Sequence, residues 1–379
     1  MPSKSFKDLL SAEESLFRNP EVFDPDYVPE EYLHREAQMR SIAACIKPAL
    51  RGERPLNALI HGPPATGKTT AMRKLFEELE DIPEARRIAG VHINCQITAT
   101  KFGIFSLIHK AVVGHLPPET GVPFSKVYEA IFRKLRRERR VLLVVLDDMD
   151  HLFHDRYANE VLYDILRAHE VFPGAKTAIF SIVSGTEFLY KLADRVRSMF
   201  RAQEIYFPPY SAGEMYDILK RRAELGFFPG VISDELVEKI ASYAYEHGDL
   251  RLGIELLKVS ALTAESHASR KIEEEHLEEA YAKASTATLR SLVEPLSAQE
   301  KLLLRLLCEA EQGITSGRLY ERFSAVEKLS YTKFYRILRK LEELRLVETR
   351  PVSGEGRGRS REILLRPSRE ELLKVLPCE

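Results

Sequence analysis

The sequence predicts an α/β protein, with a parallel sheet covered by helices on both faces, followed by an all-helical segment and a small C-terminal domain. Short apolar runs alternate with helical patterns through the first half of the chain, which favours parallel strands. The run Arg140–Asp147 is apolar on both faces, as a central parallel strand should be. Further strands are predicted at Leu56–His61, Gly90–Asn94, Ala175–Ser184 and Glu204–Phe207, with helices at Thr69–Leu79, Phe102–His115 and Lys126–Glu138.

The pattern changes after Pro208-Pro209, where no further strand is indicated for about 90 residues. Ser211 and Ser233 are plausible helix N-caps, and only Ser211, with Glu214 three residues later, fits a capping box. The segment therefore predicts a small helical domain, with helices at Ser211–Leu225, Ser233–His247, Arg251–Ala268 and Glu273–Ala284.

A third segment begins near Leu296 and predicts three helices followed by a β-hairpin. The helices are expected at Ala298–Glu311, Ser316–Phe323 and Tyr331–Arg345, and the strands at Val347–Val352 and Glu362–Arg366. Three helices followed by a hairpin are typical of a winged helix, a DNA-binding variant of the helix-turn-helix.

Composition excludes several classes of protein. The chain has 379 residues, of which 44% are hydrophobic, so disorder as the main state is excluded. The four cysteines form no CxxC pair, which argues against a zinc site or a disulfide framework. Neither a signal peptide nor an apolar run near the roughly 20 residues of a membrane span is present. We expect a cytoplasmic, nucleoid-associated protein with no membrane partner.

The clearest motif is a phosphate-binding loop between a predicted strand and a predicted helix. Residues 62–69 read GPPATGKT and match G-x-x-x-x-G-K-[ST]. Backbone N–H groups of such a loop cradle phosphates, the lysine reaches the β- and γ-phosphates, and the hydroxyl ligates Mg²⁺. The predicted nucleotide contacts are Gly62, Pro63, Pro64, Ala65, Thr66, Gly67, Lys68, Thr69 and Thr70, with Thr69 as a Mg²⁺ ligand.

A second nucleotide motif ends the central strand. Val144–Asp148 reads VVLDD, so an apolar strand delivers a carboxylate to its C-terminal end, where α/β proteins bind ligands. Asp147 is predicted to hold Mg²⁺ through water. Asp148 stands where a base could orient the attacking water, and the alternative is that it only caps the following turn.

These motifs, in this order, resemble the AAA+ ATPases, and more closely the archaeal origin-recognition and replication-initiator proteins related to the eukaryotic origin recognition complex. The resemblance covers nearly the whole chain. Besides the two nucleotide motifs, it rests on four short segments. Residues 34–36 (HRE) resemble the family's adenine-side segment, and residues 94–96 (NCQ) resemble a further short motif. Residues 205–210 (IYFPPY) resemble the junction between base and lid, and residues 248–251 (GDLR) resemble the second sensor.

The resemblance implies a division into three domains and a set of ligands. The expected domains are an AAA+ base (1–208), a helical lid (209–290) and a winged-helix DNA-binding domain (291–379). ATP or ADP with Mg²⁺ would bind the base, with Tyr210 at the junction and Arg251, on a lid helix, reaching the γ-phosphate. The implied function is a replication initiator that binds double-stranded origin DNA and whose nucleotide state governs recruitment of the replicative helicase. A paralogous initiator is a further expected partner.

Four positions depart from the family pattern and bear on ATP hydrolysis. Asp148 stands where these ATPases usually carry Glu. Gly185 replaces an amide of the first sensor, for which Ser184 or Thr186 could substitute. Met199 occupies the place of a trans-acting arginine, a role that Arg195, Arg197 or Arg201 could take. Ala65 replaces a glycine of the loop and is expected to be tolerated if its φ is negative. Because this catalysis is mostly positioning, a misplaced carboxylate lowers the rate while binding survives. We therefore expect a slow ATPase, with Asp148 and Arg251 as catalytic residues, that acts as a switch.

The DNA site is predicted on the helix Tyr331–Arg345. Apolar residues fill one face, whereas Lys333, Arg336 and Lys340 share the other, and Tyr331 and Thr332 lie near the N-terminus, which approaches base edges in such modules. Residues 330–366 carry ten basic and five acidic residues, against a net charge of -1 for the whole chain. The loop 354–361, with Arg357, Arg359 and Arg361, resembles the family's wing and suits a minor groove.

Two other functions remain open from the residues alone. The first is an ATP-dependent transcription or signalling regulator whose winged helix binds a promoter or a protein. The second is a protein-only adaptor, which the basic C-terminal segment disfavours. The family also carries a helical insertion that contacts DNA, and it would fall between Ile97 and Ser125.

Overall fold

The computed structural model describes residues 15–376, except 119, 154–156, 186, 311–312, 345 and 352–360. The chain divides into two compact units, Met1–Ile272 and Glu273–Glu379. Within the described ranges, no helix has the length and apolarity needed to cross a membrane.

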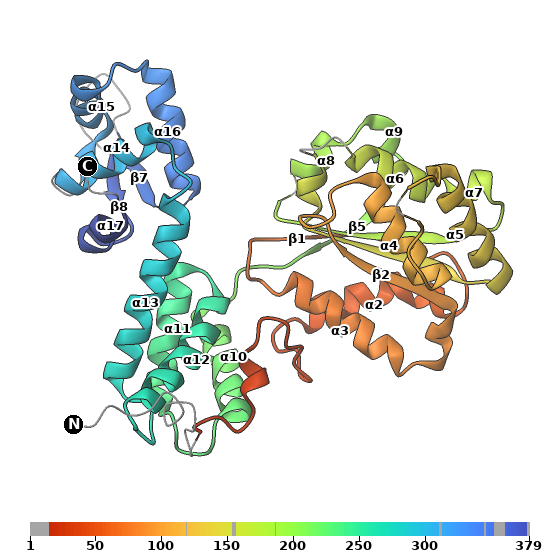
Figure 1. The fold of residues 1–379 in the computed structure, drawn as a ribbon, viewed down its shortest axis with the longest axis horizontal. Helices are drawn as coiled ribbons and strands as arrows, with labels where there is room; N and C mark the ends of the chain where they lie inside the picture. The colour runs from red at the N-terminus through yellow and green to blue at the C-terminus, as the bar shows by residue number, and fades with distance from the viewer. Residues whose placement is uncertain are drawn as a thin grey trace. The chain divides into compact units, whose positions relative to one another are not determined.

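The first unit is built on a five-stranded parallel sheet in the order β2-β3-β4-β1-β5 (Figure 1). Every residue of β3 and β4 is buried, which confirms the prediction of a central apolar strand. The carboxyl ends of β1 and β3 lead directly into the two nucleotide motifs. The strands are β1 (Asn57–His61), β2 (Ile88–Asn94), β3 (Val141–Asp147), β4 (Thr177–Val183) and β5 (Ala202–Tyr206).

Helices cover both faces of this sheet because the strands are apolar on both. Leu142, Val144 and Leu146 face one hydrophobic core, with α4, α5 and α6, and the alternate residues of β3 face a second core, with α2 and α3 (Figure 1). The helices of this layer structure are α2 (Glu36–Leu50), α3 (Lys68–Glu80), α4 (Lys101–Val113), α5 (Phe124–Glu138), α6 (Ala158–Leu166), α7 (Ala168–Val171), α8 (Glu187–Lys191) and α9 (Asp194–Arg197).

Three helices follow the base in the first unit: α10 (Ala212–Gly226), α11 (Asp234–His247) and α12 (Leu250–Ser266). The predicted capping box is confirmed, because Ser211 and Glu214 cap α10 reciprocally, whereas Ser233 caps α11 without a box. An N-terminal segment that the sequence did not predict packs on these helices through the short 3₁₀ helix η1 (Pro20–Phe23). Arg222 of α10 is buried there, and its guanidinium donates to the Val22 carbonyl.

The second unit has the predicted winged-helix elements. Its three-stranded antiparallel sheet has the order β6-β8-β7. The sheet packs on the helices through a hydrophobic core that is rich in leucine and phenylalanine. The helix predicted at Glu273–Ala284 extends to Val293, and β6 and α17 were not predicted. The elements are α13 (Glu274–Val293), α14 (Ala298–Glu309), β6 (Ile314–Thr315), α15 (Ser316–Val326), α16 (Tyr331–Glu343), β7 (Val347–Pro351), β8 (Arg361–Leu365) and α17 (Arg369–Val375).

Candidate nucleotide-binding and DNA-binding sites

The phosphate-binding loop connects β1 to α3, and two of its glycines are required by its shape. Gly62 has φ +150°, and a Cβ there would collide with the carbonyl oxygen of Phe207. Gly67 has φ +90° at the N-cap of α3, and a Cβ there would collide with the Tyr32 hydroxyl. Only glycine allows this path, which presents the N-terminus of α3 to an anion.

Ala65, which stands where the family has a glycine, does not have the negative φ under which alanine is expected to be tolerated in the loop. Its φ is +59°, in the left-handed region, so the condition of a negative φ is not met. A non-glycine residue held there costs about 1 kcal/mol or more. The loop therefore carries backbone strain at the point where it lines the cavity.

Lys68 is buried in the loop, with 8% of the residue exposed. Its Nζ donates to the carbonyl oxygens of Gly62 and Pro63, both at 2.7 Å. Burial lowers the pKa of its ammonium, while Asp147, Asp148 and Asp150 oppose that shift. The loop thus holds a positive charge next to three carboxylates, where a phosphate and a divalent cation would both be balanced.

Asp147 lies at the carboxyl end of β3 with 2% of its surface exposed. One carboxylate oxygen accepts the N–H of Asp148 at 3.1 Å, and the other lies 3.0 Å from Nε2 of His92, on the neighbouring strand β2. These two contacts fix the orientation of the carboxylate. His92 was not singled out from the sequence, since only the pairing of β2 with β3 brings it to Asp147.

Asp148 follows with φ +52°, so the chain turns sharply after β3. Burial and the neighbouring Asp147 raise the pKa of the Asp148 carboxyl, whereas His151, Lys68 and Arg251 act in the opposite direction. Its carbonyl oxygen accepts the N–H of His151 at 3.1 Å, so the backbone of Asp148 takes part in the following turn. The side chain lines the cavity described next.

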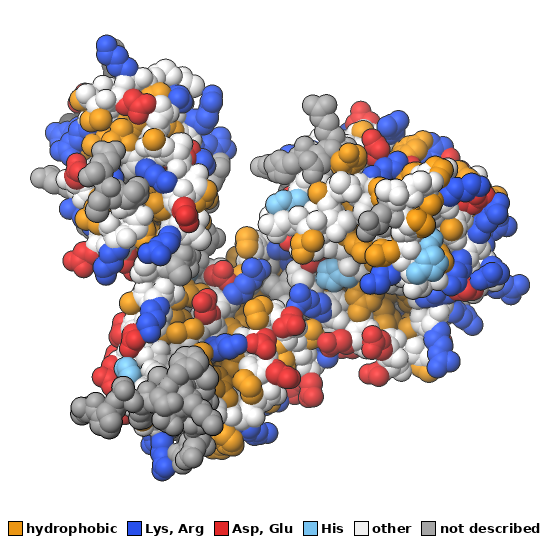
Figure 2. Space-filling view, in the orientation of Figure 1, with side chains coloured by type: hydrophobic (Ala, Val, Ile, Leu, Met, Phe, Trp, Pro, Cys, Tyr) orange, Lys and Arg blue, Asp and Glu red, His pale blue; other side chains and the backbone are white. Residues whose placement is uncertain are grey.

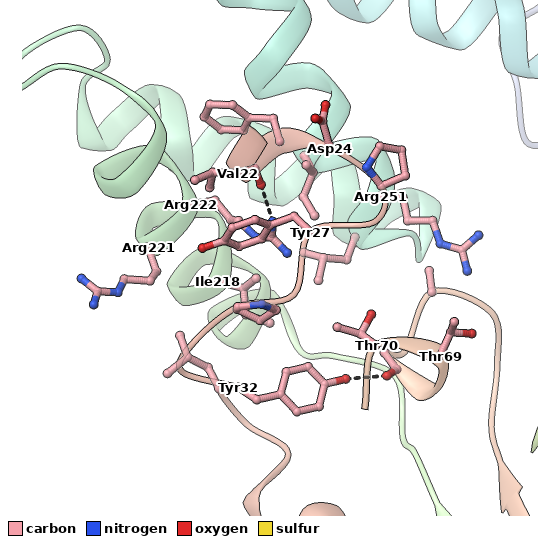
Figure 3. A pocket seen from close by; sticks show the side chains of 18 of the residues that line it. Val22, Asp24, Tyr27, Tyr32, Thr69, Thr70, Ile218, Arg221, Arg222 and Arg251 are labelled. Atoms are coloured by element: carbon pink, nitrogen blue, oxygen red, sulfur yellow. Dashed lines mark hydrogen bonds between the residues drawn. The ribbon is translucent and has the colours of Figure 1, made fainter. Parts of the chain in front are cut away.

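A cavity of about 1020 Å³ extends from the loop to the lid helices (Figure 3). Its size is at the upper end of the roughly 300–1,000 Å³ of small-molecule sites. Base and lid both contribute to it, since Thr69 and Thr70 at the start of α3 and Arg251 of α12 lie around the same space (Figure 3). Of the predicted nucleotide residues, the following line it: Pro64, Ala65, Thr66, Gly67, Lys68, Thr69, Thr70, Asp148, Tyr210 and Arg251. Gly62, Pro63 and Asp147 are not among the residues that line it.

The N-terminal segment supplies contacts that sequence reasoning missed. The Tyr32 hydroxyl donates to the carbonyl oxygen of Gly67, and burial raises the pKa of Tyr32 well above its usual range. Arg35 is 1% exposed and donates to the carbonyl oxygens of Thr66 at 3.1 Å and Pro208 at 2.7 Å. Its guanidinium lies 3.7 Å from the centre of the Tyr210 ring. Arg35 therefore joins the phosphate loop to the base–lid junction.

The donor set fits Mg²⁺ held together with phosphate. Asp147 offers a carboxylate and Thr69 a hydroxyl, which are the oxygen ligands that Mg²⁺ prefers. Across the part of the chain that the structure describes, no three His, Cys, Asp or Glu side chains form a metal cluster. One or two protein ligands suit an ion whose remaining ligands are phosphate oxygens and water.

In the winged-helix unit, the predicted DNA residues separate into two groups. Thr332 and Arg336 of α16 and Arg361 of β8 line one hollow, and Tyr331 and Lys333 are exposed at the helix N-terminus. Ser330 caps that terminus through the N–H of Lys333. All five side chains are exposed, and three of them, Lys333, Arg336 and Arg361, are basic.

Lys340, which was also predicted to contact DNA, has an ion-pair partner within the protein. Its Nζ binds both carboxylate oxygens of Glu300, on α14, at 2.8 and 2.9 Å. Helical spacing alone could not reveal this partner, because Glu300 lies 40 residues earlier in the chain. Arg357 and Arg359 lie outside the described residues.

Comparison with known protein families assigns all three parts of the chain. The model of the AAA ATPase domain matches residues 31–171, that of the Cdc6 AAA+ ATPase-type lid domain matches 216–282, and that of the CDC6 C-terminal winged helix domain matches 291–375. These ranges lie within the predicted base, lid and winged-helix domains.

Individual proteins match the chain over nearly its whole length. The "ORC1-type DNA replication protein 2" of Methanothermobacter thermautotrophicus is 50% identical over 97% of both chains. Among solved structures, the Aeropyrum pernix ORC1 protein in complex with DNA has a TM-score of 0.72 and 32% identity, covering 96% of this chain and 97% of its own. The Aeropyrum pernix ORC2 protein in ADPNP-ADP complexes has a TM-score of 0.75 and 25% identity, covering 96% and 98%.

The resemblance seen in the motifs, the three matching domains and this identity lead to one conclusion. The chain belongs to the archaeal Orc1/Cdc6 family of ORC1-type DNA replication proteins.

Proposed function

We propose that this protein is a replication initiator that binds ATP or ADP with Mg²⁺ in the cavity and double-stranded origin DNA through its winged helix and AAA+ domain. The observation that carries the nucleotide half is the cavity itself, because Lys68 and Thr69 of the base and Arg251 of the lid line one space. A ligand bound there contacts both parts, so its phosphates bias their relative position. The complex of the Aeropyrum pernix ORC2 protein with ADPNP and ADP supports this assignment.

Each residue of the cavity has a role in this proposal. The loop N–H groups and Lys68 bind phosphates, Thr69 and, through water, Asp147 hold Mg²⁺, and Arg251 binds the terminal phosphate with its two-pronged guanidinium. Mg²⁺ supplies charge stabilisation on the phosphate oxygens. Asp148 orients water, but its side chain is one methylene shorter than glutamate and starts from a left-handed backbone, so hydrolysis is slow.

The DNA half rests on the basic surface formed by Lys333, Arg336 and Arg361 around the N-terminus of α16. The complex of the Aeropyrum pernix ORC1 protein with DNA supports it. In this account, nucleotide state acts as a switch that controls recruitment of the replicative helicase, alone or together with a paralogous initiator.

Two pairs of matched variants test the proposal. Lys68→Ala should reduce the affinity for Mg·ATP and Mg·ADP at least tenfold, because the loss of a charge-assisted contact costs about 1.5–3 kcal/mol. Lys74→Ala, on the same helix, should leave this affinity unchanged.

Lys333→Gln with Arg336→Gln should weaken DNA binding, whereas Lys301→Gln with Lys374→Gln, in the same unit, should not. Equal effects within a pair would contradict the corresponding assignment.

A further inference from the structure

The amino-terminal edge of the parallel sheet, opposite the nucleotide cavity, carries a row of basic side chains. The segments 51–56, 81–87, 136–140 and 173–176 precede β1, β2, β3 and β4 in turn, so they meet at this edge. Together they hold nine basic residues and four acidic ones, whereas the whole chain has a net charge of -1. We call these four segments the basic edge.

Hydrogen bonds connect neighbouring parts of the basic edge: the segments before β1 and β4 bond to each other, and the segment before β3 bonds to the start of β2. Arg140, before β3, donates to the carbonyl oxygen of Ile88 at 3.0 Å, and Arg54, before β1, donates to that of Ala175 at 3.4 Å. Lys176, before β4, donates to the carbonyl oxygen of Gly52. Figure 2 shows basic side chains gathered at the side of the base where α5 and α7 end, away from the lid.

Most of these charges are not neutralised within the protein. Glu53 pairs with Arg51 at 3.2 Å, and Glu138 contacts both Arg137 and Arg140. In the part of the chain described by the structure, six cations have no carboxylate partner: Arg54, Arg86, Arg87, Arg136, Arg139 and Lys176. The dipole of α5 favours cations at its C-terminus, which accounts for Arg136 and Arg139. It does not account for Arg54 or Lys176, which lie outside helices.

The arrangement suits an extended anion better than a single phosphate group. The four strands lie side by side in the order β2-β3-β4-β1, so their leading segments span about 14 Å at roughly 4.8 Å per strand. One strand of DNA presents about four phosphates over such a length. Eight of the nine basic residues are arginine, whose planar fork matches phosphate oxygens.

We propose that the basic edge is a second DNA-binding surface, which contacts the phosphate backbone of double-stranded DNA without reading its sequence. It is distinct from the winged helix and from the predicted insertion at Ile97–Ser125. The inference rests on the proposed function in one respect, namely that the protein binds DNA.

The test compares three full-length variants for binding to a duplex of random sequence, by fluorescence anisotropy between 50 and 300 mM KCl. The edge variant replaces Arg54, Arg86, Arg87 and Arg139 with Gln. The control variant replaces Arg40, Lys239, Arg270 and Lys271 with Gln, which removes the same charge from the rest of the first unit. The third variant carries Lys333→Gln and Arg336→Gln. Thermal unfolding and nucleotide affinity, which should not change in the edge variant, check folding.

For each variant, the logarithm of the association constant for DNA is plotted against the logarithm of the KCl concentration. We expect this slope to be less steep by about two to four units in the edge variant, which should also bind DNA about tenfold more weakly at 100 mM KCl. The control variant should lose less than about one unit. An edge variant with the same slope as the control would overturn the proposal. Polyglutamate, an acidic polymer without phosphates, is the second ligand measured. An edge variant that loses binding to polyglutamate while keeping its affinity for DNA would also overturn the proposal. If only the third variant is impaired, the inference fails and the proposed function stands. If the wild-type protein does not bind DNA, both fail.

Discussion

At the residue scale, the proposed chemistry of the site depends on how the two carboxylates at the carboxyl end of β3, Asp147 and Asp148, are held. Asp147 is fixed by His92 and by a backbone N–H, whereas Asp148 is reached by a left-handed turn and carries a raised pKa. The first arrangement suits a rigid ligand for a cation. Under the proposed function, the second suits a base that orients the attacking water.

Asp148→Glu should raise the rate of ATP hydrolysis by about tenfold, because the added methylene extends the carboxylate toward the cavity. Asp148→Asn should lower the rate by a similar factor or more, with nucleotide affinity within about twofold of wild type. Single-turnover hydrolysis with saturating protein measures the rate apart from binding. A Glu variant slower than wild type would show that Asp148 is not the group that orients water.

The raised pKa of Asp148 also predicts that its contribution to the free energy of unfolding depends on pH. A carboxyl whose pKa is higher in the folded than in the unfolded state stabilises the fold fully below its unfolded pKa, and this contribution is lost as the pH rises through the folded pKa. Asp148→Asn should therefore stabilise the protein at pH 7 relative to wild type, and the difference should shrink toward about pH 4. Urea unfolding at both pH values measures it, and a constant difference would contradict the direction of the shift.

His92→Phe should weaken the Mg²⁺ dependence of nucleotide binding, because Asp147 loses the contact that fixes its free oxygen. Loss of such an outer contact typically costs 10–100-fold in metal affinity. The concentration of Mg²⁺ that gives half-maximal ATP binding should rise by about tenfold, while binding in EDTA stays the same. His109→Phe, another mostly buried histidine of the first unit, is the control. An unchanged Mg²⁺ midpoint would mean that His92 only packs against Phe76.

Ala65→Gly should stabilise the protein by about 1 kcal/mol, since glycine adopts a φ of +59° without strain. Ala71→Gly, inside α3, should have the opposite sign, because glycine weakens helix interiors. Chemical denaturation of both variants gives the two free energies of unfolding. If both changes destabilise equally, the strain at Ala65 is absent.

At the element scale, Arg35 couples segments that lie far apart in the sequence. It bonds Thr66 in the phosphate loop and Pro208 at the junction, 173 residues away, so its loss leaves two carbonyl oxygens without their donor. Arg35→Leu should destabilise the protein by about 2–4 kcal/mol and weaken nucleotide binding. Arg40→Leu, at an exposed position of α2, the helix that Arg35 directly precedes, should do neither. Equal unfolding midpoints for the two variants would contradict the coupling.

The elements themselves were largely predictable from local pattern. Apolar strands, the Ser211 capping box and the apolar face of α16 all follow from residues near one another in sequence. Contacts between distant segments were not. The packing of Tyr32 and Arg35 on the loop, the bond from His92 to Asp147 and the ion pair of Lys340 with Glu300 depend on which elements become neighbours in the folded chain. The positive φ of Ala65 likewise depends on the closed loop rather than on the residue.

At the scale of the whole molecule, the proposed function requires three activities in one chain: nucleotide binding in the first unit, DNA binding by the winged helix together with the AAA+ domain, and communication between the two units. Family membership establishes the class of protein. The departures at Asp148, Gly185 and Met199 bear on turnover rather than on binding. Met199 packs against the hydrophobic core of the base, and among the described residues no atom other than those of its chain neighbours lies within 4 Å of where a Cβ on Gly185 would be. We therefore expect turnover well below that of a motor ATPase.

The central claim is origin recognition, and a genome-wide binding selection tests it most directly. The full-length protein, loaded with ADP or ATP, is mixed with fragmented DNA from its own source at physiological salt, and the retained fragments are sequenced. The account predicts enrichment of one or a few intergenic repeat clusters at which replication begins. Enrichment of many dispersed promoters would contradict it and favour a transcription regulator, and no enrichment over bulk DNA would exclude sequence-specific initiation by this protein alone.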